Sequence, residues 1–337
     1  MYARQCRAGK KFGIDAAQNI LNTFINHIKF GIKDGQMTVI AQIPYKDGVL
    51  VVADSRATAQ PEDYSSVGDY ENKITYIDGY VKTAKSKDGN VITAAGGDVS
   101  LDGIISATVM EKADELESMK SGDTSRSIEV LRDKLKNVAD IIGGSNLFGE
   151  MHANVLCTVR CYDGVVRTIK TSMNTEKATA PEDRVHVELV DLRLEMPEGL
   201  ARGPDYIVQA ALRHFVNSNC PDIAHRTMED AVAAASMLEN HYINQSTEVD
   251  TKFGRARENT VGAPVTIIAV QKDRNIELTM GKTEMSIISA KNFAQVKEFI
   301  RNKMDIEQME AEARMARAAQ PVAKHENAHS KLLRSTS

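Results

Sequence analysis

The chain has 337 residues, of which 42% are hydrophobic and 26% charged, and its formal net charge is −4. This composition is that of an ordinary globular protein, and the weak negative charge disfavours a nucleic-acid binder, which needs a concentrated basic surface. No segment approaches the roughly 20 consecutive apolar residues of a membrane span, and the leading residues lack a signal-peptide core. We therefore expect a cytoplasmic protein with no nucleic-acid or membrane partner.

Cysteine and histidine residues give no sign of a disulfide framework or a metal site. The four cysteines are too few and too irregularly spaced to staple a chain of this length. Cys157 and Cys161 lie in an apolar, β-branched run, and no second Cys/His pair at zinc spacing follows, so we expect buried thiols. The histidines are scattered along the chain. We predict that the protein needs no metal and no cofactor.

The first half of the chain predicts a β-hairpin followed by further strands and two helices. Turn residues at Lys46-Asp47-Gly48 separate two runs of apolar and β-branched residues, which is the pattern of a hairpin. The polar stretch 59–72 predicts a loop, after which Lys73 would open the next strand. The expected strands cover 38–44, 49–53, 73–77 and 91–95, and the expected helices cover about 98–119 and 125–142.

The second half repeats this order of strands and then helices, and ends in a charged extension. Strands are expected over 154–160, 165–169, 264–270 and 275–279, and helices over 205–217 and 227–242. Residues 292–319 predict a charged helix, and the polar residues 321–337 predict a disordered tail. Two antiparallel strand blocks, each followed by a helix pair, indicate two packed sheets covered by helices on both outer faces.

Three segments near the start of this pattern together resemble the opening of a catalytic proteasome β subunit and of the bacterial peptidase HslV. They are Thr38-Val39-Ile40-Ala41, Lys46-Asp47-Gly48-Val49 and Val52-Ala53-Asp54-Ser55-Arg56-Ala57-Thr58. Counted from Thr38, Asp54, Arg56 and Thr58 fall without a gap where that family has its acid, arginine and threonine. Lys73, in Asn72-Lys73-Ile74, matches the family lysine after a short insertion, and Gly97 matches the glycine that ends the next strand.

The resemblance implies the α+β fold of the N-terminal nucleophile (Ntn) hydrolases, a four-layer αββα sandwich, over residues 38–290. Residues 1–37 would then be a propeptide, or a non-native leader upstream of a true start at Met37. Residues 291–337 would form the charged helix and the disordered tail. The similarity is specific over about 38–105, looser over 150–280, and absent elsewhere.

The family chemistry explains why these residue types are needed. A threonine hydroxyl becomes nucleophilic when a base removes its proton, and the free amine of an N-terminal Thr38 would be that base. Lys73 as an ammonium would hold the Thr38 oxygen, and Asp54 would keep Lys73 charged and oriented. The backbone N–H of Gly97 would bind the oxyanion. This hypothesis requires the lysine and the aspartate to lie within reach of Thr38.

The remaining family positions have supporting roles or depart from the pattern. Thr58, Ala95 and Gly96 are expected to bind the substrate strand, and Arg56 and Gly203 to support the structure. The family has a serine beside the threonine amine, whereas this chain has Ala201 or Arg202 at the best-matching place.

The resemblance therefore predicts a threonine endopeptidase that acts on proteins or peptides in a homo-oligomeric ring, with an AAA+ unfoldase as a candidate partner. Two alternatives stay open. One is a non-catalytic structural subunit of a proteasome-like assembly, and the other is an Ntn amidase or transpeptidase with a different substrate. The sequence does not define the cleavage specificity, the ring size or the role of the tail.

Overall fold

The computed structural model describes residues 38–61, 63–120, 124–143, 151–175, 179–203 and 207–319. The predicted leader, 1–37, and the predicted tail, 321–337, lie outside the described residues. The chain divides into two compact units, Met1–Lys297 and Glu298–Ser337. All the strands of the described ranges belong to the first unit.

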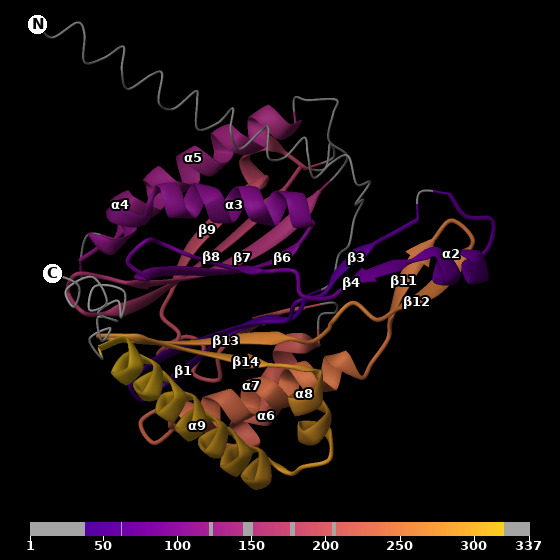
Figure 1. Cartoon of the computed structure of the whole chain (residues 1–337). Coiled ribbons are helices and arrows are strands. Elements are labelled where there is room, and N and C mark those ends of the chain that lie inside the picture. The colour runs from indigo at the N-terminus through magenta and orange to yellow at the C-terminus, as the bar shows by residue number, and fades with distance from the viewer. Residues whose placement is uncertain are drawn as a thin grey trace, which may run out of the picture. The chain divides into compact units, whose positions relative to one another are not determined.

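The fold is of mixed α and β class and rests on two five-stranded antiparallel sheets (Figure 1). The first has the strand order β10-β1-β2-β13-β14, with bounds β1 Ile40–Tyr45, β2 Gly48–Ala53, β10 Leu200–Arg202, β13 Val265–Gln271 and β14 Asn275–Met280. The second has the order β5-β6-β7-β8-β9, with bounds β5 Thr83–Lys85, β6 Val91–Gly97, β7 His152–Arg160, β8 Val166–Asn174 and β9 Val185–Val190.

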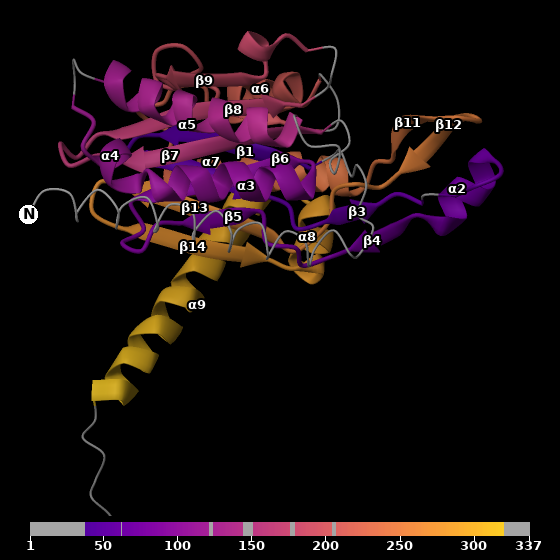
Figure 2. The same cartoon turned by 90° about the horizontal axis from the view of Figure 1, so that it is seen from above.

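Helices pack on both sheets. On the second sheet lie α3 Val99–Glu111, α4 Ala113–Glu117 and α5 Ser125–Gly143; on the side of the first lie α6 Val208–Asn219, α7 Met228–Ile243 and α8 Lys282–Ser289 (Figures 1 and 2). A short 3-10 helix spans Pro181–Asp183, and α9 spans Phe293–Ala319. None of the helices in the described ranges is long and apolar enough to cross a membrane.

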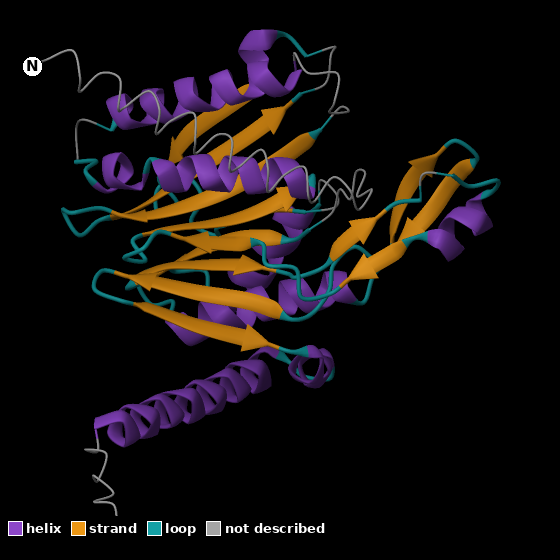
Figure 3. Ribbon diagram, turned by 45° about the horizontal axis from the view of Figure 1, so that its top comes forward, coloured by secondary structure: helices purple, strands orange, loops and turns teal. Residues whose placement is uncertain are grey.

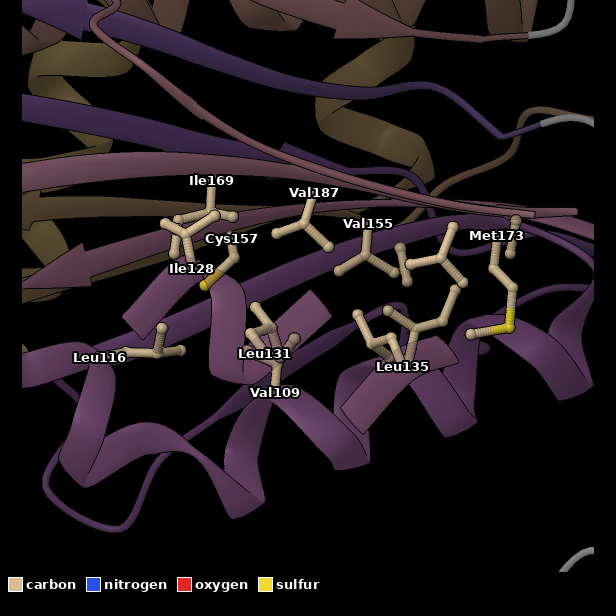
Figure 4. Close-up of a cluster of buried hydrophobic side chains, with 14 of the residues drawn as sticks. Val109, Leu116, Ile128, Leu131, Leu135, Val155, Cys157, Ile169, Met173 and Val187 are labelled. Carbon is tan, nitrogen blue, oxygen red and sulfur yellow. The ribbon is translucent and has the colours of Figure 1, made fainter. Parts of the chain in front are cut away.

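Two apolar cores hold these layers together. Between the sheets, side chains of β1, β2 and β13 meet those of β6 and β7, and Ile40, Val51 and Leu156 are completely buried there. Outside the second sheet, α3, α4 and α5 pack on β7, β8 and β9 through Leu131, Leu135 and their neighbours (Figure 4). Cys157 belongs to this outer core and is a free buried thiol, as predicted.

The predicted β1–β2 hairpin is present, and it contributes the central strand of the first sheet, β2, together with its neighbour β1. Ile40 lies opposite Ala53 and Tyr45 opposite Gly48. Strand β2 pairs with β13 on its other side. The residues of β1 and β2 are buried along the whole of both strands. Gly48 is required at the turn, because an added Cβ would lie 2.0 Å from the Val270 carbonyl oxygen. The hairpin thus fixes the position of Thr38, which lies two residues before its first strand.

An arm of two small sheets and one helix extends from the large sheets (Figures 1 and 3). It consists of β3 Ala57–Ala59, α2 Val67–Lys73, β4 Thr75–Ile77, β11 Thr247–Thr251 and β12 Gly254–Glu258. At its tip the rings of Tyr64, Tyr70 and Phe253 pack edge to face.

The arm corrects the prediction of a loop over 59–72 with a strand opened by Lys73. Lys73 is the last residue of α2, and β4 begins at Thr75. The Ser66 side chain caps α2 by accepting a hydrogen bond from the Asp69 N–H, a signal that is visible in the sequence as Ser-x-x-Asp. The polar composition and Gly68 concealed this helix.

A buried arginine ties the hairpin to the loop between α6 and α7. Arg226 is 1% exposed, and its guanidinium donates to the carbonyl oxygens of Pro44, Pro197, Cys220 and Pro221 at 2.7–3.2 Å. The bonds to Pro44 and Cys220 satisfy carbonyl groups of buried residues.

We expect Arg226→Leu to lower the free energy of unfolding by at least about 2 kcal/mol, because it leaves buried carbonyl groups without a donor. Urea denaturation of the full chain measures this change. Arg255→Leu is the matched control, since the Arg255 side chain is 72% exposed in the arm and should cost under about 1 kcal/mol. Equal costs for the two variants would contradict the structural role of Arg226.

Candidate active site

Thr38 lies two residues before β1, against Gly96 near the end of β6. Its side chain is buried, with 7% of the residue exposed. Its hydroxyl oxygen accepts a hydrogen bond from the Nζ atom of Lys82. A buried threonine hydroxyl held by a buried ammonium is the first element of the candidate site.

Asp54 follows β2 and forms the second element. The distance from Lys82 Nζ to Asp54 Oδ1 is 2.9 Å, and the two side chains are 2% and 0% exposed. The same Oδ1 accepts the Val39 N–H at 3.2 Å, while Oδ2 accepts the N–H groups of Arg56 at 2.9 Å and Gly262 at 3.1 Å. Four donors therefore fix this carboxylate, and one of them belongs to the residue next to Thr38.

The structure places Lys82, not Lys73, at Thr38. Lys73 lies at the end of α2, where its ammonium pairs with Asp69 at 3.0 Å and its side chain is 49% exposed. The prediction that Lys73 belongs to the site is therefore wrong, and Lys82 occupies the place expected of it. The requirement that a lysine and an aspartate reach Thr38 is met by Lys82 together with Asp54.

The arm explains this error, and a hairpin signal points to the right lysine. Residues of β3, α2 and β4 separate Asp54 from Lys82, so the insertion is longer than the resemblance implied. The turn at Lys87–Asn90 joins β5 to β6 with Thr83 opposite Ala94. Continuing that register by one residue puts Lys82 opposite Ala95, and the Ala95 N–H donates to the Lys82 carbonyl at 2.9 Å.

The glycine pair that ends β6 closes the site on the side of the second sheet. A Cβ added at Gly96 would lie 3.1 Å from the Thr38 Cβ, so Gly96 packs directly against Thr38. Gly97 has φ +126°, and a Cβ there would lie 2.4 Å from the His152 carbonyl oxygen. Glycine is required at this position because other residues rarely adopt such a backbone. The oxyanion role of the Gly97 N–H stays a prediction.

Arg56 and Thr58 lie where the arm leaves the body of the domain. The Arg56 guanidinium pairs with Asp78 at 2.7 Å and donates to the Asn259 carbonyl at 3.1 Å. Arg56 thereby joins the two roots of the arm, in keeping with the structural role expected of it. Thr58 is buried in β3 opposite Tyr76, and its substrate role stays a prediction.

The positions of the missing family serine lie on β10. Ala201 is completely buried opposite Ala41, and its N–H donates to Gln209 at 2.7 Å. Arg202 lies opposite Ile40. Gly203 packs on Val208, since an added Cβ would lie 2.8 Å from a Val208 methyl carbon. No hydroxyl side chain is supplied by these three residues.

Three buried carboxyl groups, those of Asp54, Asp102 and Glu239, interact electrostatically with the Lys82 ammonium. Burial raises the pKa of Asp54, and the Lys82 ammonium and the backbone N–H groups of Arg56 and Gly262 oppose that change. Burial raises the pKa of Asp102, on α3, well above its ordinary value, against the attraction of Lys82. Burial and the Asp54 charge likewise raise the pKa of Glu239, on α7, well above its ordinary value. Sequence reasoning identified neither Asp102 nor Glu239.

The geometry supports hydroxyl activation and no metal coordination by the described residues. Within the described ranges, no group of three His, Cys, Asp or Glu side chains could hold a metal ion. The chain of contacts from Thr38 Oγ1 through Lys82 to Asp54 can lower the cost of negative charge on the hydroxyl oxygen. No protein-family model matches this chain, and neither does any curated protein.

The free energy of unfolding of two variants can distinguish the buried role of Lys82 from the surface role of Lys73. We expect Lys82→Met to lower the free energy of unfolding by roughly 3–5 kcal/mol, because it leaves Asp54 as a buried charge without its partner. Lys73→Met removes only an exposed pair within α2 and should cost under about 1 kcal/mol. Chemical denaturation of both variants measures the difference. A Lys82→Met chain as stable as the Lys73→Met chain would contradict the buried pair.

Proposed function

We propose that this chain is an Ntn hydrolase of the proteasome type that acts as a threonine peptidase after the bond between Met37 and Thr38 has been cut. The observation that carries the proposal is the buried contact of Thr38 Oγ1 with Lys82 Nζ, which in turn is held by Asp54. It joins a hydroxyl, an ammonium and a carboxylate two residues before β1, and the proposal requires that the segment preceding Thr38 be removed.

The arrangement of the layers supports the same proposal. The two large sheets pack face to face, and helices cover the outer face of each. This is the order expected of the four-layer αββα sandwich. Thr38 lies two residues before β1 of the first sheet and packs against Gly96 of β6 in the second.

In the proposed reaction the free amine of Thr38 takes the proton of its own hydroxyl, and the oxygen attacks a peptide carbonyl. Lys82 stabilises the negative charge on the attacking oxygen, and Asp54 holds Lys82 in place. The amine then gives its proton to the leaving nitrogen as the C–N bond breaks, which leaves an ester on Thr38. Water then attacks this ester while the amine takes a proton from it, and the amine returns the proton to the Thr38 oxygen as the ester C–O bond breaks, so that the carboxylic acid leaves and the hydroxyl is restored.

Release of the amine is a condition of this chemistry. In the full-length chain, the Thr38 nitrogen belongs to the peptide bond with Met37 and has no basic lone pair. Either Thr38 attacks that bond and frees a propeptide, or a chain that starts at Met37 loses its methionine. Both routes produce the same mature end.

We expect the purified, active protein to begin at Thr38, and intact-mass measurement with amino-terminal sequencing tests this. In the mature chain, Thr38→Ala should lower the hydrolysis of fluorogenic peptides by at least about 10³-fold, because it removes the nucleophile. Thr38→Ser is the matched control, since it keeps both the hydroxyl and the amine and should stay active.

The alternatives predict different results. A non-catalytic assembly subunit would keep Met37 attached and hydrolyse no peptide. An Ntn amidase or transpeptidase would start at Thr38 but act on small amides and not on peptides. Peptide hydrolysis that survives Thr38→Ala would remove Thr38 from the mechanism and overturn the proposal.

A further inference from the structure

One buried carboxyl group on α7, the helix that packs on β1 and β2, has no role in the proposed reaction. Glu239, on α7, is completely buried, and neither of its carboxyl oxygens has a hydrogen-bond partner among the described residues. The contrast with Asp54, whose two oxygens take four donors, is sharp. A carboxylate buried in this way would be costly, because no donor replaces its lost hydration.

The sequence of α7 explains how the carboxyl comes to lie there. Thr227 and Asp230 form a capping box that fixes the start of the helix. The helix then runs through Ala233, Ala234 and Ala235, whose small side chains let it pack closely on β1, β2 and β13. Ser236 precedes Glu239 by three residues, so both lie on one helix face. The Ser236 hydroxyl is also buried without a partner among the described residues.

The charges that act on Glu239 are those of the candidate site. Asp54 raises its pKa and Lys82 lowers it, and burial is the largest cause of the upward shift. The strands that pack on α7 offer no other charge, since β2 and β13 carry no ionisable side chain and β1 carries only Tyr45, at its hairpin end.

The helices beside α7 do not neutralise Glu239 either. On α6 Arg213 pairs with Glu198, and on α8 Lys282 pairs with Asp78. Their other ionisable side chains, and those of α7 itself besides Glu239, are His214, Glu284, Glu229, Asp230, His241 and Tyr242. None of these is among the charges that shift the pKa of Glu239.

Lys82 carries one positive charge, which cannot neutralise both Asp54 and Glu239 if both carboxyl groups are ionised. It already holds Asp54 and the Thr38 hydroxyl. A second ionised carboxylate at Glu239 would repel Asp54 and compete for the same ammonium. The contact with Thr38 is preserved when Glu239 carries a proton, because a neutral acid exerts only a weak field on its neighbours.

We propose that Glu239 is a positioning residue of the Thr38 site, that it is held as an uncharged carboxylic acid, and that its ionisation ends activity on the alkaline side by drawing Lys82 away from Thr38. This inference rests on the proposed function. It gives the site a second carboxyl that acts on the reacting oxygen only through Lys82.

The test is the pH dependence of kcat/KM for the mature chain and its Glu239→Gln variant, measured with a fluorogenic peptide. Glutamine keeps the size of a neutral acid and cannot ionise. We expect kcat/KM of the variant to stay within about threefold of the parent value at neutral pH. At the alkaline end it should exceed the parent value about tenfold, because the fall of kcat/KM in the variant begins at higher pH. Glu229→Gln, on the same helix, is the matched control and should leave the profile unchanged.

A second readout does not depend on turnover. The infrared spectrum at neutral pH should contain a carbonyl band of one protonated carboxyl that is present in the parent chain and lost in Glu239→Gln. The stability of the variant relative to the parent should also increase as pH rises above about 4.3, since the unfolded parent then gives up a proton that its folded form retains.

The outcomes separate this inference from the proposed function. An active mature chain whose alkaline limb is unaffected by Glu239→Gln overturns the inference alone. So does a Glu239→Gln variant that folds normally but is inactive at every pH, because the ionised carboxylate would then be required. Absence of the infrared difference contradicts the uncharged state. A mature chain that begins at Thr38 and hydrolyses no peptide overturns both proposals.

Discussion

The ion pair between Asp54 and Lys82 is the interaction on which the architecture of the site depends. Each partner is removed from water, so each needs the other, together with further donors, to remain charged. The Asp54 carboxylate gathers N–H groups from the chain next to Thr38 and from both roots of the arm. The charge on one side chain thereby sets the positions of several backbone segments that are far apart in sequence.

Much of the fold could be predicted from the sequence, because local patterns determine it. Apolar runs around a Lys-Asp-Gly turn predict the β1–β2 hairpin, and strand blocks followed by helices predict two covered sheets. The short strands β10, β11 and β12 could not be predicted in this way. Their pairing depends on distant partners, such as Ala41 for Ala201, and the segments themselves are polar or only three to five residues long.

A residue of the candidate site could be predicted where strands of fixed length set its distance in sequence from Thr38. It could not be predicted where an insertion of variable length lies between them. Asp54 directly follows the β1–β2 hairpin, so counting from Thr38 places it at the site, and the glycine pair Gly96-Gly97 is recognised because it ends an apolar strand, β6. Lys82 follows an insertion whose length no strand constrains, and counting therefore selected Lys73. Glu239 could not be found by either route, because a glutamate within an alanine-rich helix looks like a surface residue until its neighbours in space are known.

The two roots of the arm meet at a single oxygen atom, Oδ2 of Asp54, through Arg56 and Gly262. Within the arm, the strands pair with one another, β3 with β4 and β11 with β12, and not with the two large sheets. Insertions, deletions and substitutions at the tip of the arm should therefore leave the contacts of Asp54 unchanged. A deletion at the base removes a hydrogen-bond donor of Asp54. Variation among relatives should thus be concentrated at the outer turns of the arm and fall away toward Asp54.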